Sequence, residues 1–228
     1  MKRIPCIATI VALLIGSHAA TAQSFEGTLG LSASGNGKTY EADAVISGPK
    51  ARIVPLGDQS ADQYPVFDYG KGKVVLVSTK DRYYTEMPLD SALKAVSSLS
   101  MTIGSTGRRE NIRGMDAEEY KAVDKAKGIE VTLWATAALK VEPYFLLGLQ
   151  QQGGAEGAQI AKAAMMLFDK GLLPLRIECA GKGGSAPFRW EVTKIERKAV
   201  ASESFDVPSG YQSLSSYLKK NVQTPRGR

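Results

Sequence analysis

The chain has 228 residues, of which 29 are Lys or Arg and 23 are Asp or Glu, and its formal net charge is +6. The basic residues are scattered among acidic ones, as in residues 121–125, and form no dense stripe of the kind that binds nucleic-acid phosphates. Nucleic acid is therefore not an expected partner.

The first residues have the parts of a secretory signal peptide. Lys2 and Arg3 precede an apolar run over residues 7–15, and small residues follow up to Ala22. The apolar run is well short of the roughly 20 residues that a membrane-spanning helix requires. We therefore expect a signal peptide over residues 1–22, cleavage after Ala22, and an exported, periplasmic protein that does not span the membrane.

Cleavage at that point would remove Cys6 and the only histidine, His18, and would leave Cys179 as the one cysteine. A chain without histidine has no His-dependent catalytic triad, no His-ligated zinc and no haem with a His axial ligand. We expect no metal, no cofactor, no disulfide within the chain and no enzymatic activity. Cys179 ends an alternating apolar run, which predicts a buried side chain rather than a reactive thiol.

Alternating apolar and polar residues predict strands through the first half of the mature chain. Residues 25–33 have this period, and the turn Gly35-Asn36-Gly37 joins them to a second such run over 40–47, which predicts a hairpin. Further strands are predicted at 51–54, 66–69, 73–79 and 82–86. A short helix should follow Pro88, with Leu89, Leu93, Val96 and Leu99 on one face.

In the second half, helical patterns interrupt the strands. Strands are predicted at 108–112, 117–123, 129–136, 172–179 and 188–198. One helix should begin at Pro143, and the next has its apolar residues at helical spacing, with Gly171 as its C-cap. Those residues are Ile160, Ala163, Ala164, Leu167 and Phe168. A last helix is predicted at 211–220, before a flexible basic tail at 222–228.

This order of elements predicts one domain over residues 23–221 with a mainly β (α+β) fold. We expect an antiparallel meander of about 9 to 11 strands, curved into a half-barrel with helices over its concave face. The space between the sheet and the helices would suit a hydrophobic ligand.

Seven short segments in order along the mature chain carry a resemblance to a known family. They are FEGTL (25–29), GPKARI (48–53), YTEMP (84–88), ENIRGM (110–115) leading to Tyr120, LWAT (133–136), GLLPL (171–175) and SFDVPSGY (204–211). The chain resembles an uncharacterised exported domain family, a domain of unknown function grouped with the LolA/LolB-like periplasmic lipoprotein carriers. The resemblance implies a lid of helices over an apolar cavity, and it makes Arg52 the candidate for a contact with that lid.

Eight side chains are candidates for the wall of this hydrophobic cavity: Trp134, Phe145, Leu146, Leu147, Met165, Met166, Phe168 and Trp190. The breadth of the apolar helical face, the paired methionines and the glycines at 148, 153, 154 and 157 favour a cavity with a movable lid. The same side chains are also suited to an ordinary core. Trp134 lies on the opposite face of its strand from Leu133, so both sides of that strand are expected to be covered.

Three functions remain open at this point. The first is a non-catalytic exported binding protein for a hydrophobic ligand, either a lipid or a lipoprotein acyl chain. The alternative is a protein-interaction or assembly module of the cell envelope that has the same fold and an interior filled by its own side chains. The third is a hydrolase built on carboxylates. Glu118 and Glu119 cannot be its catalytic pair, because adjacent residues of a strand face opposite ways.

Overall fold

The structure is a computed structural model that describes residues 24–35, 37–57, 62–90, 96, 98–143, 148–149, 153–181 and 187–222. The predicted signal peptide and almost all of the predicted basic tail lie outside these residues. The described strands are β1 Glu26–Gly35, β2 Lys38–Ser47, β3 Lys50–Pro55, β4 Gln63–Asp68, β5 Lys73–Ser78, β6 Tyr83–Pro88, β7 Thr102–Ile112, β8 Met115–Asp124, β9 Ile129–Thr136, β10 Leu173–Cys179, β11 Phe188–Arg197 and β12 Gln212–Ser213.

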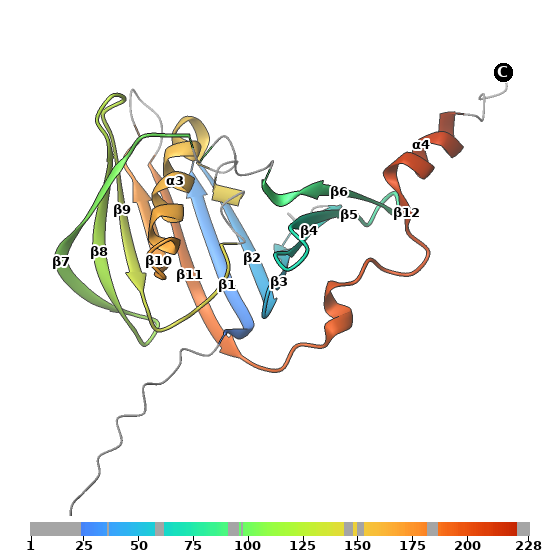
Figure 1. Cartoon of the computed structure of the whole chain (residues 1–228), viewed down its shortest axis with the longest axis horizontal. Coiled ribbons are helices and arrows are strands. Elements are labelled where there is room, and N and C mark those ends of the chain that lie inside the picture. Colours follow the sequence, from blue (N-terminus) through green and yellow to red (C-terminus); the bar gives the residue numbers. More distant parts are fainter. Residues whose placement is uncertain are drawn as a thin grey trace, which may run out of the picture.

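These strands form one curved sheet in the order β12-β6-β5-β4-β3-β2-β1-β11-β10-β9-β8-β7 (Figure 1). Strands β1 to β6 make one meander and β7 to β11 make another, and the antiparallel pairing of β1 with β11 joins the two. β12 is the exception, because it pairs in parallel with β6. The predicted mainly β fold, an open and curved antiparallel sheet, is confirmed.

Helix α3, Gly157–Phe168, packs against β9 and β10 and follows a single turn of 3-10 helix at Gly154–Glu156. The chain leaves the helix through Gly171, which has a φ of +74°. The Gly171 N–H donates to the Phe168 carbonyl at 2.8 Å, and the Leu172 N–H donates to the Leu167 carbonyl at 3.0 Å. A left-handed glycine with two such bonds satisfies the last carbonyls of a helix. The predicted helix and its glycine C-cap are both present.

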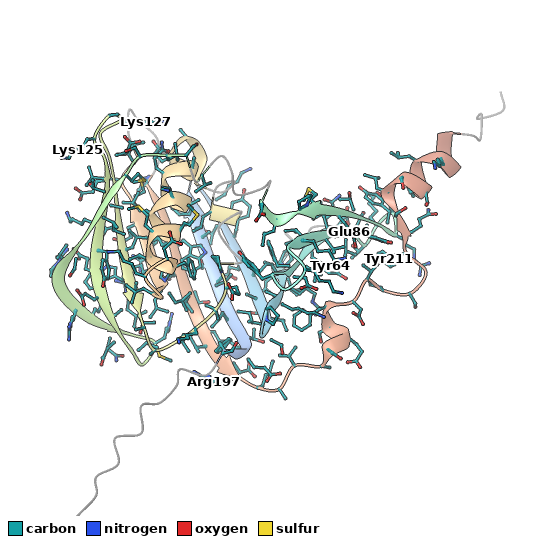
Figure 2. The ribbon with its side chains drawn as sticks, in the orientation of Figure 1. Tyr64, Glu86, Lys125, Lys127, Arg197 and Tyr211 are labelled. Atoms are coloured by element: carbon teal, nitrogen blue, oxygen red, sulfur yellow. The ribbon has the colours of Figure 1, made fainter. Side chains whose placement is uncertain are left out.

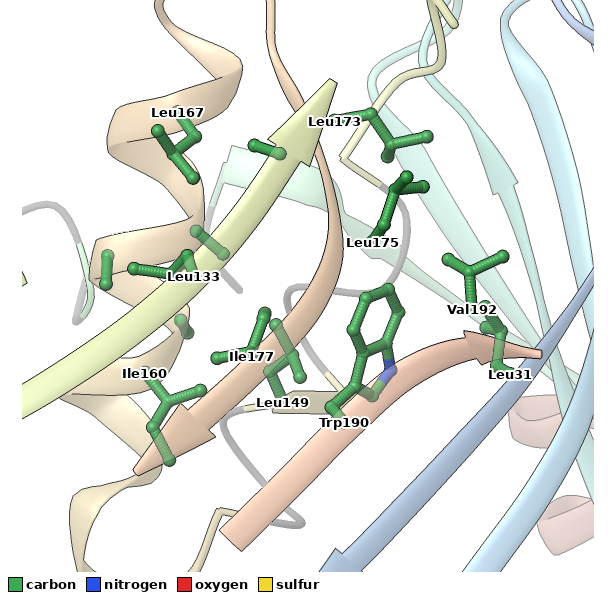
Figure 3. Packing of buried hydrophobic residues seen from close by; sticks show 14 of the residues in the cluster. Leu31, Leu133, Leu149, Ile160, Leu167, Leu173, Leu175, Ile177, Trp190 and Val192 are labelled. Atoms are coloured by element: carbon green, nitrogen blue, oxygen red, sulfur yellow. The ribbon is translucent and has the colours of Figure 1, made fainter. Parts of the chain in front are cut away.

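One face of the sheet, here called the inner face, carries the main hydrophobic core. Leu133, Ile177 and Trp190 are neighbours across β9, β10 and β11, and all three are buried. Ile160 and Leu167 of α3 belong to the same core (Figure 3). The alternation of side chains along each strand therefore assigns these residues to the side that α3 covers.

The opposite, outer face has a smaller core over β2 to β6. Its buried members are Val66, Val75, Val77 and Phe205. Phe205 ends a 3-10 turn, Ser202–Phe205, in the segment that runs from β11 back along the sheet to β12 (Figure 1). Helix α4, Leu214–Val222, follows β12, and the Tyr217 ring lies 5.1 Å from that of Tyr83 on β6. The segment between β11 and β12 therefore covers the outer face of the first meander, whereas α4 contacts Tyr83, which lies on the same face of β6 as Met87.

Strand β7 differs most from its prediction, because it begins at Thr102 rather than at residue 108. Gly104 and Gly107 suggest a break in the sequence, but the strand continues through a bulge between Ser105 and Arg109. The Gly107 N–H donates to the Ser105 hydroxyl at 3.0 Å, and the Arg108 N–H donates to the Thr106 hydroxyl at 3.3 Å. These local bonds replace bonds to the neighbouring strand, so the pairing resumes after the bulge.

Other differences lie at the helices. The predicted last helix starts at Leu214 rather than at residue 211, because Gln212 and Ser213 pair with β6. Leu89, Asp90 and Val96 are helical after Pro88, whereas residues 91–95 lie outside the described part of the chain. The helix predicted from Pro143 is described only at residues 148–149, which are helical. Across the described ranges, no helix combines the length and the apolar character needed to span a membrane.

Candidate functional site

The candidate site is the inner face of the sheet together with the helix that packs on it. Trp190 comes from β11 and lies opposite Ile177 on β10 and Ala33 on β1. Leu149 joins Trp190 and Ile177 in the same close-packed group (Figure 3). The site therefore draws side chains from both meanders and from the helical segment before α3.

The predicted cavity residues on α3 lie at the border of this core. Met165 and Phe168 are partly buried and pack against it, and Met166 is half-buried. Phe145, Leu146 and Leu147 lie outside the described residues. The structure thus brings Met165, Phe168 and Trp190 into contact with one continuous core, whereas their role in the wall of a cavity stays a prediction.

The apolar inner face continues beyond the strands on which α3 packs. Ile53 on β3 lies opposite the buried Ala44, and Leu76 on β5 lies opposite Pro65 on β4. Ile53, Leu76 and Pro65 are half-buried, and Met87 on β6 is 41% exposed. We call Ile53, Pro65, Leu76 and Met87 the inner strip. It offers apolar surface to solvent on the same face that α3 covers further along the sheet.

A polar side chain inside α3 was missed by the sequence analysis. Gln159 is 1% exposed, and within the described part of the chain neither its amide nitrogen nor its amide oxygen has a hydrogen-bond partner. It precedes Ile160 and lies one turn before Ala163, both of which are fully buried. In the sequence, Gln159 stands at the border of the apolar face of the helix. A glutamine in this position usually faces solvent, so the sequence pattern does not reveal that it is buried.

Cys179 is a buried thiol at the end of β10, and the charge of the buried Glu156 acts on it. Burial, and to a lesser extent the charge of Glu156, raise the pKa of the Cys179 thiol to about 11. Glu156 is itself buried at the start of α3. A thiol with this pKa stays protonated at neutral pH and is a poor nucleophile. The predicted burial of Cys179 is confirmed.

Trp134 is partly buried at the edge of the main core, but its strand position turns it to the outer face, away from Trp190 and α3. It is the neighbour of Glu119 on β8 and of Arg176 on β10, and it alternates with the buried Leu133. The guanidinium carbons of Arg108 and Arg176 lie 5.8 Å and 5.9 Å from its ring centroid. Trp134 therefore borders the same core as Met165 and Phe168 but lies on the other face of the sheet, and both faces of its strand are covered as predicted.

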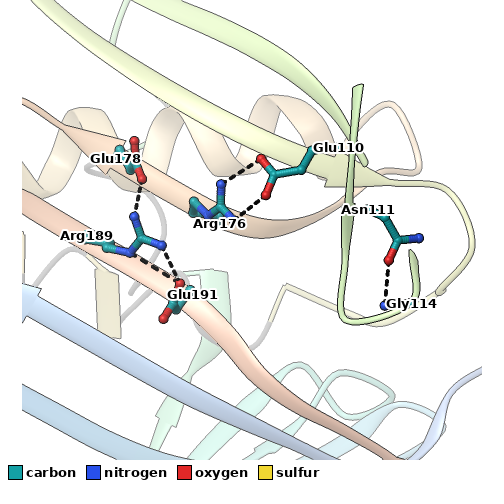
Figure 4. Close-up of polar contacts among 7 residues, drawn as sticks. All are labelled: Glu110, Asn111, Gly114, Arg176, Glu178, Arg189 and Glu191. Carbon is teal, nitrogen blue, oxygen red and sulfur yellow. Dashed lines mark hydrogen bonds and ion pairs between the residues drawn. The ribbon is translucent and has the colours of Figure 1, made fainter. Parts of the chain in front are cut away.

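Ion pairs of Arg176 and Arg189 also lie on the outer face (Figure 4). Arg176 donates two hydrogen bonds to the Glu110 carboxylate, at 3.0 Å and 2.9 Å, and these bonds lower the pKa of Glu110. Arg189 donates to Glu178 at 2.5 Å and to Glu191 at 2.7 Å. Arg176 links β10 to β7, and Arg189 links β11 to β10. These ion pairs therefore connect strands of the sheet and do not indicate a ligand site.

Arg52 also lies on the outer face. It is the neighbour of Val45 on β2 and of Val66 on β4, and Val66 belongs to the smaller core. Its guanidinium carbon lies 5.7 Å from the Tyr64 ring centroid. Tyr64 and Tyr211 of the C-terminal segment lie at the same end of the molecule (Figure 2), and both pack on the smaller core. Arg52 thus faces the side that the C-terminal segment covers, whereas a lid contact requires the side of α3.

The carboxylates behave as the strand geometry requires. Glu118 is the neighbour of the buried Ala135 and faces inward, whereas Glu119 is the neighbour of Trp134 and faces outward, where it pairs with Arg108. These two residues therefore do not form a catalytic pair. Within the described ranges, no group of three or more His, Cys, Asp or Glu residues is arranged to hold a metal ion.

Fold and site together define an open, curved antiparallel sheet with an apolar inner face and one described helix packed on it. Residues 25–211 match the family described as Domain of unknown function (DUF4412). The chain belongs to this family, which confirms the expected membership of an uncharacterised domain family. No curated protein matches the chain.

Several solved structures are similar to the chain. One is an uncharacterized conserved protein from Thermus thermophilus, with a TM-score of 0.48, 9% identity and coverage of 83% of this chain and 90% of that one. Another is PNGF-II, with a TM-score of 0.46, 15% identity and coverage of 86% of this chain and 32% of that one. A third is a putative outer membrane lipoprotein-sorting protein domain from Vibrio parahaemolyticus, with a TM-score of 0.32, 9% identity and coverage of 79% and 88%. Likenesses this distant are too weak to assign a function.

Proposed function

We propose that the protein is a non-catalytic, exported binding protein that holds a hydrophobic ligand, a lipid or an acyl chain, against the inner face of its sheet. The observation that supports this most directly is the continuity of that face. It is apolar under α3 and stays apolar along the inner strip, where Met87 is 41% exposed. A ligand that extends from the α3 border onto the inner strip would bury apolar surface on both sides.

The chemistry of the border residues suits such a ligand. Met165 and Phe168 are partly buried against the core, so a ligand can contact them without unfolding α3. A methionine side chain is flexible and polarizable, and it adapts to acyl chains of different shape. The proposed binding requires no proton transfer and no nucleophile, which agrees with the raised pKa of Cys179.

Native mass spectrometry of the protein purified from its producing cells tests the proposal. We expect a co-purifying apolar molecule in a one-to-one complex, identified after extraction. Met165→Glu should lose this molecule while circular dichroism shows the fold intact, because a carboxylate at the border of an apolar site is costly to desolvate. Leu218→Glu on α4 is the matched control, since Leu218 is 50% exposed, and it should retain the ligand.

A second function, an envelope interaction module, is favoured by one observation. Helix α4 projects away from the sheet (Figure 1), and Leu218 on it is among the large apolar side chains exposed to solvent. This function would be supported if native mass spectrometry gave the mass of the protein without a ligand and the protein took up no added lipid. In that case Leu218→Glu, rather than Met165→Glu, should abolish capture of the partner.

A further inference from the structure

Helix α4 has a fixed starting point at the edge of the sheet. Gln212 and Ser213 pair with β6, and the Ser213 hydroxyl accepts a hydrogen bond from the Ser216 N–H at 3.3 Å. A serine hydroxyl bonded in this way caps the first turn of a helix. The Tyr217 ring lies beside Tyr83 on β6, and beyond this contact α4 projects away from the sheet (Figure 1). The helix is therefore held to the sheet at its first turns only.

The apolar face of α4 is only partly covered by the protein. Leu214, Tyr217 and Leu218 are three and four positions apart, so they share one face of the helix. Leu214 and Tyr217 are half-buried, whereas Leu218 is 50% exposed, more than any other large apolar side chain in the described part of the chain. Ser215 and Lys219 are exposed on the other side of the helix. α4 is thus amphipathic, and Leu218 is available to a second apolar surface.

Positive charge accompanies this exposed apolar side chain. Residues 207–228 include no acidic residue and four basic ones, which are Lys219, Lys220, Arg226 and Arg228. The turn beside β12 adds no excess of either sign, because Lys80 Nζ lies 3.6 Å from Asp62 Oδ2 and Arg82 follows Asp81. The positive charge is therefore concentrated on α4 and on the residues that follow it. A surface that combines this charge with an exposed leucine is complementary to anionic lipids.

We propose that α4 docks on the surface of an anionic membrane, with Leu218 inserted among the lipids and the charges of Lys219 and Lys220 held near the phosphate groups. Amphipathic helices that lie on membranes combine an apolar face with lysines in this way. The inner strip ends on β6 at Met87, on the same face of that strand as Tyr83, which contacts α4. A membrane bound at α4 would therefore lie next to the edge at which the inner strip ends. This inference goes beyond the proposed ligand binding, because it concerns α4 and not the residues under α3.

Co-sedimentation with lipid vesicles tests the docking. The exported protein, purified from its producing cells, is mixed at low salt with vesicles of phosphatidylcholine alone or of phosphatidylcholine and phosphatidylglycerol in equal parts. Half-maximal binding to the anionic vesicles should need a lipid concentration at least about tenfold lower than binding to the neutral ones. Salt at about 0.5 M should release most of the bound protein, because it screens the charges. Leu218→Ser keeps every charge, and it should weaken binding to the anionic vesicles by roughly tenfold.

Two double variants with the same change of charge distinguish a docking site from a general effect of net charge. Lys219→Glu with Lys220→Glu should raise the lipid concentration for half-maximal binding at least about tenfold. Lys125→Glu with Lys127→Glu changes the exposed turn between β8 and β9, far from α4 (Figure 2), and should bind as the wild type does. All four substituted lysines are on the surface, so circular dichroism should show the fold intact in both variants.

Equal losses of binding in the two double variants would overturn the inference, since net charge alone would then account for the binding. Equal binding of the wild type to both kinds of vesicle would overturn it as well. Binding to neither kind would leave α4 to a protein partner and would also overturn it. None of these outcomes bears on a ligand of the inner face, because native mass spectrometry of the purified protein tests that ligand separately.

Discussion

Leu167 is the side chain through which the docking of α3 is best tested. It is 0% exposed and belongs to the inner-face core, so Leu167→Ala removes three buried carbon atoms. At about 0.8 kcal/mol for each buried CH2 group, the lost transfer free energy is about 2.4 kcal/mol. The cavity left behind adds to this, because the neighbouring strands relax only in part. We expect the free energy of unfolding to fall by about 3 kcal/mol.

Urea unfolding monitored by circular dichroism measures this change. The slope of the free energy with denaturant should stay constant, since the same surface is exposed on unfolding. Leu218→Ala is the matched control on α4, where the side chain is 50% exposed, and it should cost less than about 1 kcal/mol. Similar losses for the two variants would refute the reasoning, because they would show that α3 is not packed on β9 and β10 as described.

Three further predictions concern single groups. Gly171→Ala should lower the free energy of unfolding by about 1–2 kcal/mol, because φ at this position is +74°. Gly104 does not have a positive φ, so Gly104→Ala should leave the free energy of unfolding almost unchanged in the same urea assay. The folded Cys179 thiol keeps its proton to about pH 11 against an ordinary pKa of 9.0, so its contribution to stability is present below pH 9 and lost toward pH 11. Over that window the stability of the wild type should fall more steeply than that of Cys179→Ala, by up to about 1.4 kcal/mol per pH unit, and parallel curves would contradict the burial of the thiol. The hydrogen bonds of Arg176 lower the pKa of Glu110 from 4.5. The ion pair therefore stabilises the fold above pH 4.5, and this stabilisation is lost as the pH falls through the pKa that Glu110 has in the folded protein. Arg176→Met should make the free energy of unfolding depend less on pH in this range, as measured by urea unfolding at a series of acidic pH values.

The regular parts of the fold follow from the sequence, because they depend on local period. Residues 129–136 alternate strictly, and the predicted strand matches β9 at both ends. The helix containing Ile160 and Leu167 was predicted with its C-cap, since Gly171 stops it by a local backbone rule. Where each element needs only its neighbours in the chain, the pattern of residues is sufficient.

The remaining features depend on contacts between distant segments. β12 exists only because Gln212 and Ser213 reach the edge of β6, and no local pattern marks a strand of two residues. The bulge in β7 is stabilised by side chains of its own loop, yet its glycines look like a chain break in the sequence. Arg52 faces outward because of the register of its strand, which its local sequence does not fix. The alternation with Leu133, by contrast, was enough to put Trp134 on the opposite face of its strand from the core.

The pairing of β1 with β11 has a consequence for how the protein reaches its native state. Most strand pairs within the two meanders are hairpins, which close over short stretches of chain and form quickly; the exception is β9 with β10, whose connection contains α3. Their junction, by contrast, brings Leu29 beside Ile195 and requires most of the chain to be present first. Each meander is therefore left with an open central edge until β11 is synthesised and docked. During this interval the unpaired edges of β1 and β10 are the positions at which the chain is most exposed to mispairing and aggregation.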